Sequence, residues 1–119
     1  MSTPTIFESE YRCCLIVWEN EPLKSAQLAE LCKEQLGWAR TTTYTVLKRL
    51  SDRGVLQNNK TVVTSLVSKE EAQISEVNTL IEKKFEGSLP AFMAAFANGR
   101  KLKKEEADAL RAMIDGAKE

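Results

Sequence analysis

The 119-residue chain contains no histidine, and this absence excludes much of the common chemistry of proteins. Imidazole is the side chain that titrates near neutral pH and the commonest metal ligand. Ser-His-Asp triads, Cys-His dyads and imidazole-bound zinc are therefore excluded. The sequence also lacks a Gly-rich phosphate loop, a paired nucleophile and base, and a clustered set of metal ligands. We expect a protein that is not an enzyme and that needs no metal and no other cofactor.

Long apolar segments are missing too. A membrane-spanning helix needs about 20 consecutive apolar residues, and the longest runs here, Cys13–Trp18 and Ala91–Ala97, are much shorter. Residues 1–6 lack the basic start and the apolar centre of a secretory signal. The sequence therefore predicts a cytoplasmic protein with no membrane partner.

Cysteine is scarce: Cys13, Cys14 and Cys32 form no C-x-x-C pair, and their number is odd. Thiols stay reduced in the cytosol, so we expect no disulfide framework. The favoured interpretation is that all three are small buried hydrophobic residues. A redox-sensing thiol is the alternative, and that function needs an exposed cysteine.

Net charge is absent as well, because 17 Lys and Arg residues balance 17 Asp and Glu residues. The balance conceals a local excess. Residues 38–60 contain five basic side chains and one acidic side chain, which gives this segment a net charge of +4. A basic segment in a neutral protein is typical of a nucleic-acid-binding surface. An ordinary solvated helix face is the alternative interpretation.

Apolar residues at helical spacing predict three helices in the first half of the chain, over about 8–20, 24–36 and 40–53. Gly37 and Gly54 follow the second and third of these segments, as expected at the C-terminal ends of helices.

Two β-branched segments, residues 55–57 and 61–67, predict a hairpin whose turn is Asn58-Asn59-Lys60. A single hairpin is marginally stable unless it packs against helices. The candidates for this packing face are Leu56, Val62 and Leu66.

The remaining residues predict three further helices. The first begins after a capping box, Ser68-Lys69-Glu70-Glu71, and ends near Phe85. The second follows Ser88, and the third covers about 103–117. We expect a mainly α fold with a small β-hairpin wing, in which residues 1–67 form one domain and residues 68–119 a helical region.

Three helices followed by a hairpin are the element order of a winged helix-turn-helix, whose third helix lies in the major groove of DNA. The segment Trp38–Leu56, with its sequence WARTTTYTVLKRLSDRGVL, resembles the recognition helix of the penicillinase-repressor family. This family includes the β-lactamase and methicillin-resistance repressors and a copper-responsive branch. Resemblance to its first helix, dimerisation segment and last helix extends over Glu10–Trp18, Lys84–Leu89 and Leu102–Met113.

The resemblance implies a homodimeric repressor that binds a palindromic double-stranded DNA operator. Arg49 is the best candidate for bidentate reading of guanine, and the family's matching arginine is used at DNA. Threonine hydroxyls can bond phosphates or bases, and basic side chains can bond the backbone. The predicted DNA-binding residues are Arg40, Thr41, Thr42, Tyr44, Thr45, Lys48, Arg49, Arg53 and Lys60.

A dimer is also expected from the size of the C-terminal region, because about 50 residues in three short helices cannot close a core alone. Two copies would bury each other's apolar faces and present two recognition helices to the operator. The predicted dimer interface comprises Leu80, Ile81, Phe85, Leu89, Phe92, Met93, Phe96, Leu110, Met113 and Ile114.

The sequence departs from the family pattern at two places. The wing is short, and only Lys60 can serve as its basic tip. The antibiotic-resistance branch is inactivated by cleavage at an Asn-Phe bond, where this chain has Ala95-Phe96. That difference argues against a membrane sensor-protease as a partner, and no paired Cys-x-Cys motif supports copper sensing.

The short wing and the neutral charge balance leave a second function open, a winged-helix protein–protein adaptor with little or no DNA binding. Salt distinguishes the two functions. The logarithm of a DNA affinity falls linearly with the logarithm of the salt concentration, whereas binding by an adaptor would depend weakly on salt.

Overall fold

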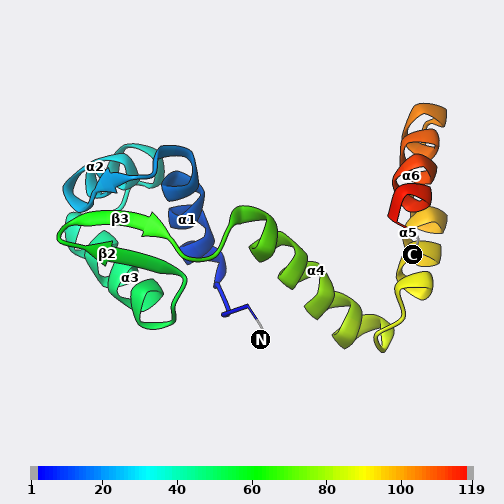
Figure 1. Ribbon diagram of the computed structural model, residues 1–119, viewed down its shortest axis with the longest axis horizontal. Coiled ribbons are helices and arrows are strands. Elements are labelled where there is room, and N and C mark those ends of the chain that lie inside the picture. Colours follow the sequence, from blue (N-terminus) through cyan, green and yellow to red (C-terminus); the bar gives the residue numbers. More distant parts are fainter. Residues whose placement is uncertain (1–2, 118–119) are drawn as a thin grey trace. The chain divides into compact units, whose positions relative to one another are not determined.

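A computed structural model describes residues 3–117, which contain six α-helices and one three-stranded antiparallel sheet (Figure 1). The elements in chain order are α1 (Glu8–Asn20), β1 (Leu23–Lys24), α2 (Ser25–Leu36), α3 (Arg40–Asp52), β2 (Leu56–Asn59), β3 (Val62–Ser65), α4 (Lys69–Phe85), α5 (Leu89–Gly99) and α6 (Lys104–Ala117). The chain divides into two compact units, of which the first ends at Val77 and the second begins at Asn78.

The helix ends of the first unit follow from local hydrogen bonding. At the start of α1 the Glu10 carboxylate accepts a hydrogen bond of 3.0 Å from the Phe7 amide, which has no partner within the helix. At the end of α2 Gly37 has a φ of +72°, and its amide bonds the carbonyls of Cys32 and Lys33. Glycine takes this left-handed conformation without a steric penalty. All three predicted helices of this unit are confirmed.

The predicted hairpin is confirmed, but its turn lies further along the chain than expected. Asn58 and Asn59 belong to β2, and the turn consists of Lys60 and Thr61, with φ values of +52° and +67°. Positive φ at both central residues is typical of a type I′ turn, whose twist matches that of the flanking strands. The prediction was wrong because Asn is the commoner residue in such turns. A third strand, β1, pairs with β3 and was not predicted, since two residues carry no periodicity.

The core of the first unit lies between α1, α2, α3 and the sheet. Leu28, Leu50 and Leu56 are fully buried at its centre. In β3 Val63 is buried and Val62 is half-buried, and Leu66, just after the strand, is 55% exposed. The expectation for Val62 and Leu66 was therefore wrong. Alternate residues of a strand point to opposite faces. Because Val63 points into the core, Val62 and Leu66 point away from it.

Helix α4 begins at the predicted capping box. The Ser68 hydroxyl accepts a 3.0 Å hydrogen bond from the Glu71 amide, and the Glu71 carboxylate accepts one of 3.1 Å from the Ser68 amide. Both amides belong to the first turn, where helices lack internal acceptors. One turn later Ala72 is buried against the core of the first unit.

The second unit has almost no interior of its own. The Ser88 hydroxyl accepts a 3.1 Å hydrogen bond from the Ala91 amide, which starts α5 as predicted. Phe85 and Phe92 stack edge to face, with ring centroids 5.5 Å apart. Yet among the described residues from 78 to 117, Ile81 is the single buried side chain. The second unit therefore leaves most of its apolar side chains in contact with water.

Candidate nucleic-acid interface

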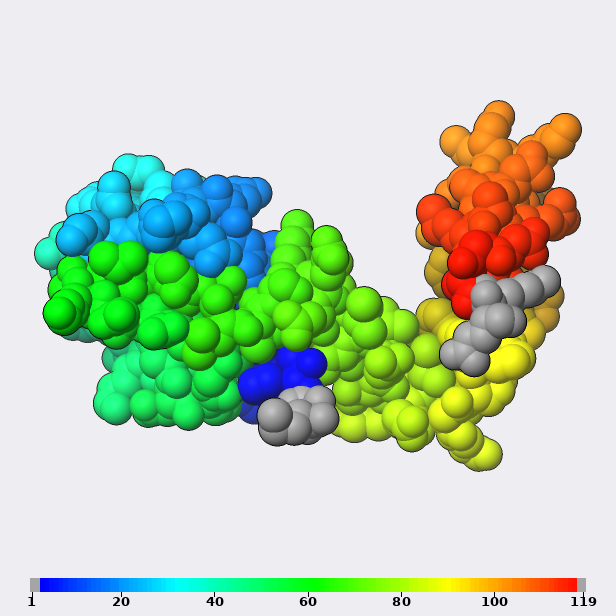
Figure 2. Space-filling view, in the orientation of Figure 1, coloured from blue at the N-terminus to red at the C-terminus, as the bar shows by residue number. Residues whose placement is uncertain are grey.

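Helix α3 has one buried face and one exposed face. The buried face consists of Thr43, Val46, Leu47 and Leu50. The exposed side chains of the helix include the predicted Arg40, Thr41, Thr42, Tyr44, Thr45, Lys48 and Arg49. Because the buried face packs against α2 and β2, the polar face of α3 is held outward. Figure 2 shows the hairpin on the surface of this unit, with α2 along one edge and α3 along the other.

The threonines of α3 have different surroundings. Thr43 is completely buried, and its hydroxyl lies beside the Cys32 thiol, so Thr43 belongs to the core and not to the exposed face. Thr41 and Thr42 are exposed. The Thr45 hydroxyl donates a 2.9 Å hydrogen bond to the Thr41 carbonyl. Its one hydrogen is therefore in use, and in this rotamer Thr45 can only accept hydrogen bonds from a ligand.

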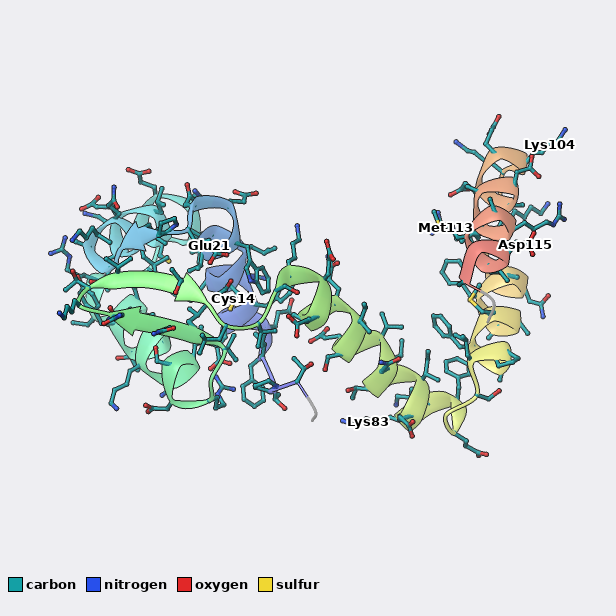
Figure 3. The ribbon with its side chains drawn as sticks, in the orientation of Figure 1. Cys14, Glu21, Lys83, Lys104, Met113 and Asp115 are labelled. Atoms are coloured by element: carbon teal, nitrogen blue, oxygen red, sulfur yellow. The ribbon has the colours of Figure 1, made fainter. Side chains whose placement is uncertain are left out.

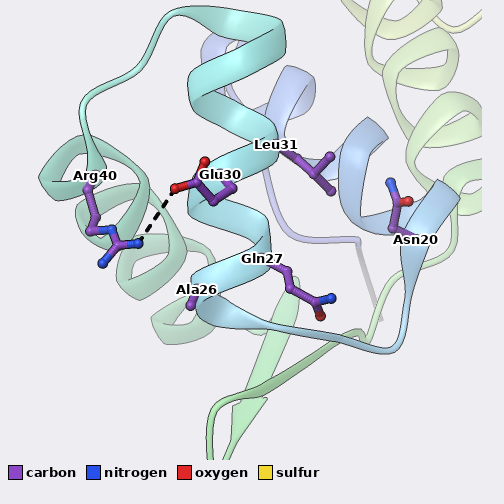
Figure 4. Close-up of a pocket in the computed structure, with 6 residues that line it drawn as sticks. All are labelled: Asn20, Ala26, Gln27, Glu30, Leu31 and Arg40. Carbon is purple, nitrogen blue, oxygen red and sulfur yellow. Dashed lines mark ion pairs between the residues drawn. The ribbon is translucent and has the colours of Figure 1, made fainter.

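Arg40 begins α3 and approaches Glu30 of α2, with 3.9 Å between guanidinium nitrogen and carboxylate oxygen (Figure 4). Both side chains are about 60% exposed, at 61% and 59%. They border an open, largely apolar groove of about 470 Å³, which is also lined by Asn20, Ala26, Gln27 and Leu31. A pair this exposed contributes about 0–1 kcal/mol, so Arg40 can exchange Glu30 for another anion at little cost.

Lys48 and Arg49 differ in their partners although they are neighbours. The Lys48 ammonium lies 3.3 Å from the Asp52 carboxylate, one turn further along α3. Arg49 is exposed, and no side-chain ion pair involves it within the part of the chain that the structure describes. Arg49 therefore presents a free guanidinium on the outer face of the helix.

Arg53, by contrast, is held within the protein. Its guanidinium forms an ion pair with the buried Glu10 of α1 and donates a 3.0 Å hydrogen bond to the Thr5 carbonyl. It also lies over the Phe7 ring, 5.2 Å from the centroid. From the sequence Arg53 is predicted to bind DNA, and its pairing with Glu10 is not predicted. Local patterns give no sign of a pair whose members are 43 residues apart.

The environment of Glu10 favours its ionised form. Burial alone would raise the pKa of this carboxyl group. Hydrogen bonds from Arg53 and from the Phe7 amide, together with the positive charges of Arg53 and Arg49, outweigh burial and hold the pKa below its ordinary value of 4.5. Glu10 is thus a buried anion at neutral pH.

The wing is fastened to the rest of the first unit by polar contacts. The Glu21 carboxylate accepts hydrogen bonds of 2.8 Å from both the amide and the hydroxyl of Ser65, at the end of β3 (Figure 3). The Ser25 amide donates one of 2.8 Å to the Thr61 carbonyl in the turn. These bonds fix the hairpin to the segment that joins α1 and α2, and Lys60 is exposed at its tip.

All three cysteines are fully buried, as predicted. Burial raises the pKa of Cys14 to about 12. A hydrogen bond between the thiols of Cys13 and Cys32 raises the pKa of Cys13 and lowers that of Cys32. None of the three thiols reaches solvent, so the exposed thiol that a redox sensor requires is missing from this fold.

The predicted dimer residues lie on α4, α5 and α6. Five of them are between 39% and 66% exposed, namely Leu80, Leu89, Phe96, Met113 and Ile114. Phe85, Phe92, Met93 and Leu110 are half-buried. Figure 3 shows Met113 projecting from α6.

Residues 3–117 offer no site of two other kinds. No group of three or more Cys, Asp or Glu side chains in this range is arranged to hold a metal ion. No helix in the same range combines the length and apolar character needed to cross a bilayer.

These features define a winged-helix protein with a helical C-terminal region. The sequence model of the penicillinase repressor family matches residues 6–116, nearly the whole chain, and the chain belongs to this family. No curated protein matches it. Membership points to a DNA-binding transcriptional repressor, in a family of regulators rather than enzymes.

Proposed function

We propose that the protein is a homodimeric repressor that binds a palindromic operator through the outer face of α3. The observation that carries the proposal is the division of this helix, whose apolar side is buried while its threonines, Tyr44, Lys48 and Arg49 are exposed. Residues 1–67 would form the DNA-reading domain, and residues 68–119 the dimerisation region.

Each side chain of this face has a role that suits its chemistry. Arg49 reads guanine through two parallel hydrogen bonds. Lys48 and Arg40 bond phosphates, for which they give up Asp52 and Glu30, their exposed partners in the free protein. Thr41, Thr42, Tyr44 and Thr45 contact phosphates, sugars and thymine methyl groups, and Lys60 contacts the backbone from the wing.

Dimerisation is supported by the second unit, because its exposed Leu, Phe, Met and Ile side chains are not buried within the single chain. Apolar surface of this kind on a soluble helical region marks an interaction site. A two-fold dimer gives two recognition helices, and these fit half-sites about 10 base pairs apart or a multiple of that distance.

Selection from a random pool of duplex DNA with the purified protein tests the proposal. We expect an inverted repeat, and we expect Arg49→Ala to weaken binding of the selected sequence about 5- to 150-fold, since a bidentate pair discriminates by about 1–3 kcal/mol. The affinity of the wild type should fall steeply with salt. Arg12→Ala, in which an exposed cation of α1 is lost, is the control for charge.

Two outcomes would contradict the proposal. If no sequence is enriched even at low salt, the protein does not read DNA. If binding of a protein partner instead depends weakly on salt and survives Arg49→Ala, the adaptor function is favoured.

A further inference from the structure

Two arginines of α3 face the same buried carboxylate. Arg49 and Arg53 are four residues apart, so their side chains emerge from one side of the helix, one turn from each other. Glu10 of α1 lies against this side and is only 4% exposed. An open depression of about 460 Å³ brings these groups together, and its lining consists of Phe7, Glu10, Arg49, Asp52 and Arg53.

Arg53 holds the carboxylate in the free protein. Its guanidinium pairs with Glu10, and further hydrogen bonds join it to the carbonyls of Thr5, at 3.0 Å, and Arg49, at 3.4 Å. With the Phe7 ring beneath it, the Arg53 side chain is only 29% exposed. So many contacts leave Arg53 poorly placed to reach a DNA phosphate.

Arg49 is close to the same carboxylate but is not bound to it. Both groups line the depression, and the positive charge of Arg49 favours the ionised form of Glu10. The second carboxylate of the depression, Asp52, is paired with Lys48 at 3.3 Å. Each carboxylate near Arg49 therefore already has another cation, and Arg49 stays exposed.

We infer that Arg53 is a positioning residue, which saturates Glu10 and thereby keeps the guanidinium of Arg49 available for DNA. A buried carboxylate that loses its partner is strongly unfavourable and attracts the nearest cation. In the absence of Arg53 that cation is Arg49, one turn away. The inference rests on the proposed function, since it assigns to Arg53 a role that acts through the DNA contact of Arg49.

The test compares the wild type with Glu10→Gln, Arg53→Met and the double variant on the sequence that the wild type selects. We expect Arg53→Met to bind about tenfold more weakly or worse, and to lose preference for guanine at the position that Arg49 reads. The double variant has no buried carboxylate to capture Arg49. It should regain the wild-type affinity and the guanine preference.

Matched controls separate this effect from a simple loss of charge. Arg12→Met also removes one positive charge, but from an exposed pair with Glu8 at 3.9 Å, and should bind like the wild type. In an Arg49→Ala background, Arg53→Met should cause no further loss of affinity, because the side chain through which it acts is gone.

Three results would overturn the inference. Wild-type affinity of Arg53→Met means that Arg49 is not captured. Equal weakness of Arg53→Met and the double variant means that Arg53 touches DNA itself. If Arg53→Met does not fold, the double variant is compared with Glu10→Gln instead. Weaker binding of DNA by the double variant than by Glu10→Gln would assign Arg53 to a DNA contact and overturn the inference. Lack of any DNA binding by the wild type instead contradicts the proposed function.

Discussion

At the scale of single residues, burial determines what each ion pair of α3 means. Arg40 and Lys48 meet carboxylates on the surface, where water screens both charges and the pairs exchange easily. Arg53 meets Glu10 where the carboxylate is 4% exposed, so breaking that pair leaves an uncompensated buried charge. Identical charges in the sequence thus have unequal roles in the folded chain.

The low pKa of Glu10 predicts a specific dependence of stability on pH. Because the pKa is lower in the folded chain than in the unfolded chain, ionised Glu10 stabilises the fold fully above about pH 4.5. This contribution is lost as the pH falls through the folded-state pKa. We expect Glu10→Gln to be less stable than the wild type near neutral pH, and the gap to shrink below about pH 4.5.

Urea denaturation of both proteins between about pH 3 and pH 7 measures this gap. Glu8→Gln is the control, because Glu8 is an exposed carboxylate of the same helix turn. A gap between Glu10→Gln and the wild type that does not change with pH would show that the ion pair is not its source.

At the scale of elements, helices could be predicted and strand details could not. Helix α3 has a local repeat of apolar residues and a glycine after its end, so its bounds follow from neighbouring residues. Which residues of β3 point into the core depends on the register of strand pairing. A shift of one residue would bury Val62 in place of Val63. Strand β1 exists only because β3 lies beside it.

The conformation of the hairpin turn predicts a stabilising substitution. Thr61 has a φ of +67°, where a β-branched residue is strained and glycine is not. We expect Thr61→Gly to raise the free energy of unfolding by about 0.5–1 kcal/mol, after the greater flexibility of glycine in the unfolded chain is subtracted. Thermal or urea denaturation measures the change, and Thr64→Gly in β3 should lower stability. A less stable Thr61→Gly protein would show that the turn is not strained.

At the scale of the whole molecule, the two units differ in how many side chains they bury. The first unit buries Leu28, Leu50, Leu56 and their neighbours around three helices and a sheet. In the second, the described residues bury Ile81 alone. The dimer interface predicted from the sequence stays a prediction, and so does the functional boundary at residue 68.

A charge placed in the apolar surface of α6 should prevent self-association. Met113 is 66% exposed in the single chain, so Met113→Glu should leave the first unit folded while it places a charge in the proposed interface. Sedimentation should show a wild-type dimer and a variant monomer. Asn98→Glu, an exposed polar position of α5, should remain dimeric.

Stability provides a second readout of the same association. The melting temperature of the wild type should rise with protein concentration, and that of Met113→Glu should not. A wild type that sediments as a monomer at every concentration would exclude the dimer.

The helices, the hairpin, the family and the basic segment could all be predicted from residue types at short spacing. Which members of the basic segment are free depends on how the chain folds. Thr43 turns inward to Cys32, Arg53 is held by Glu10, and Arg49 remains outside. The reason is physical: a cation's availability depends on the anions that folding brings within a few ångströms, and these come from distant parts of the chain.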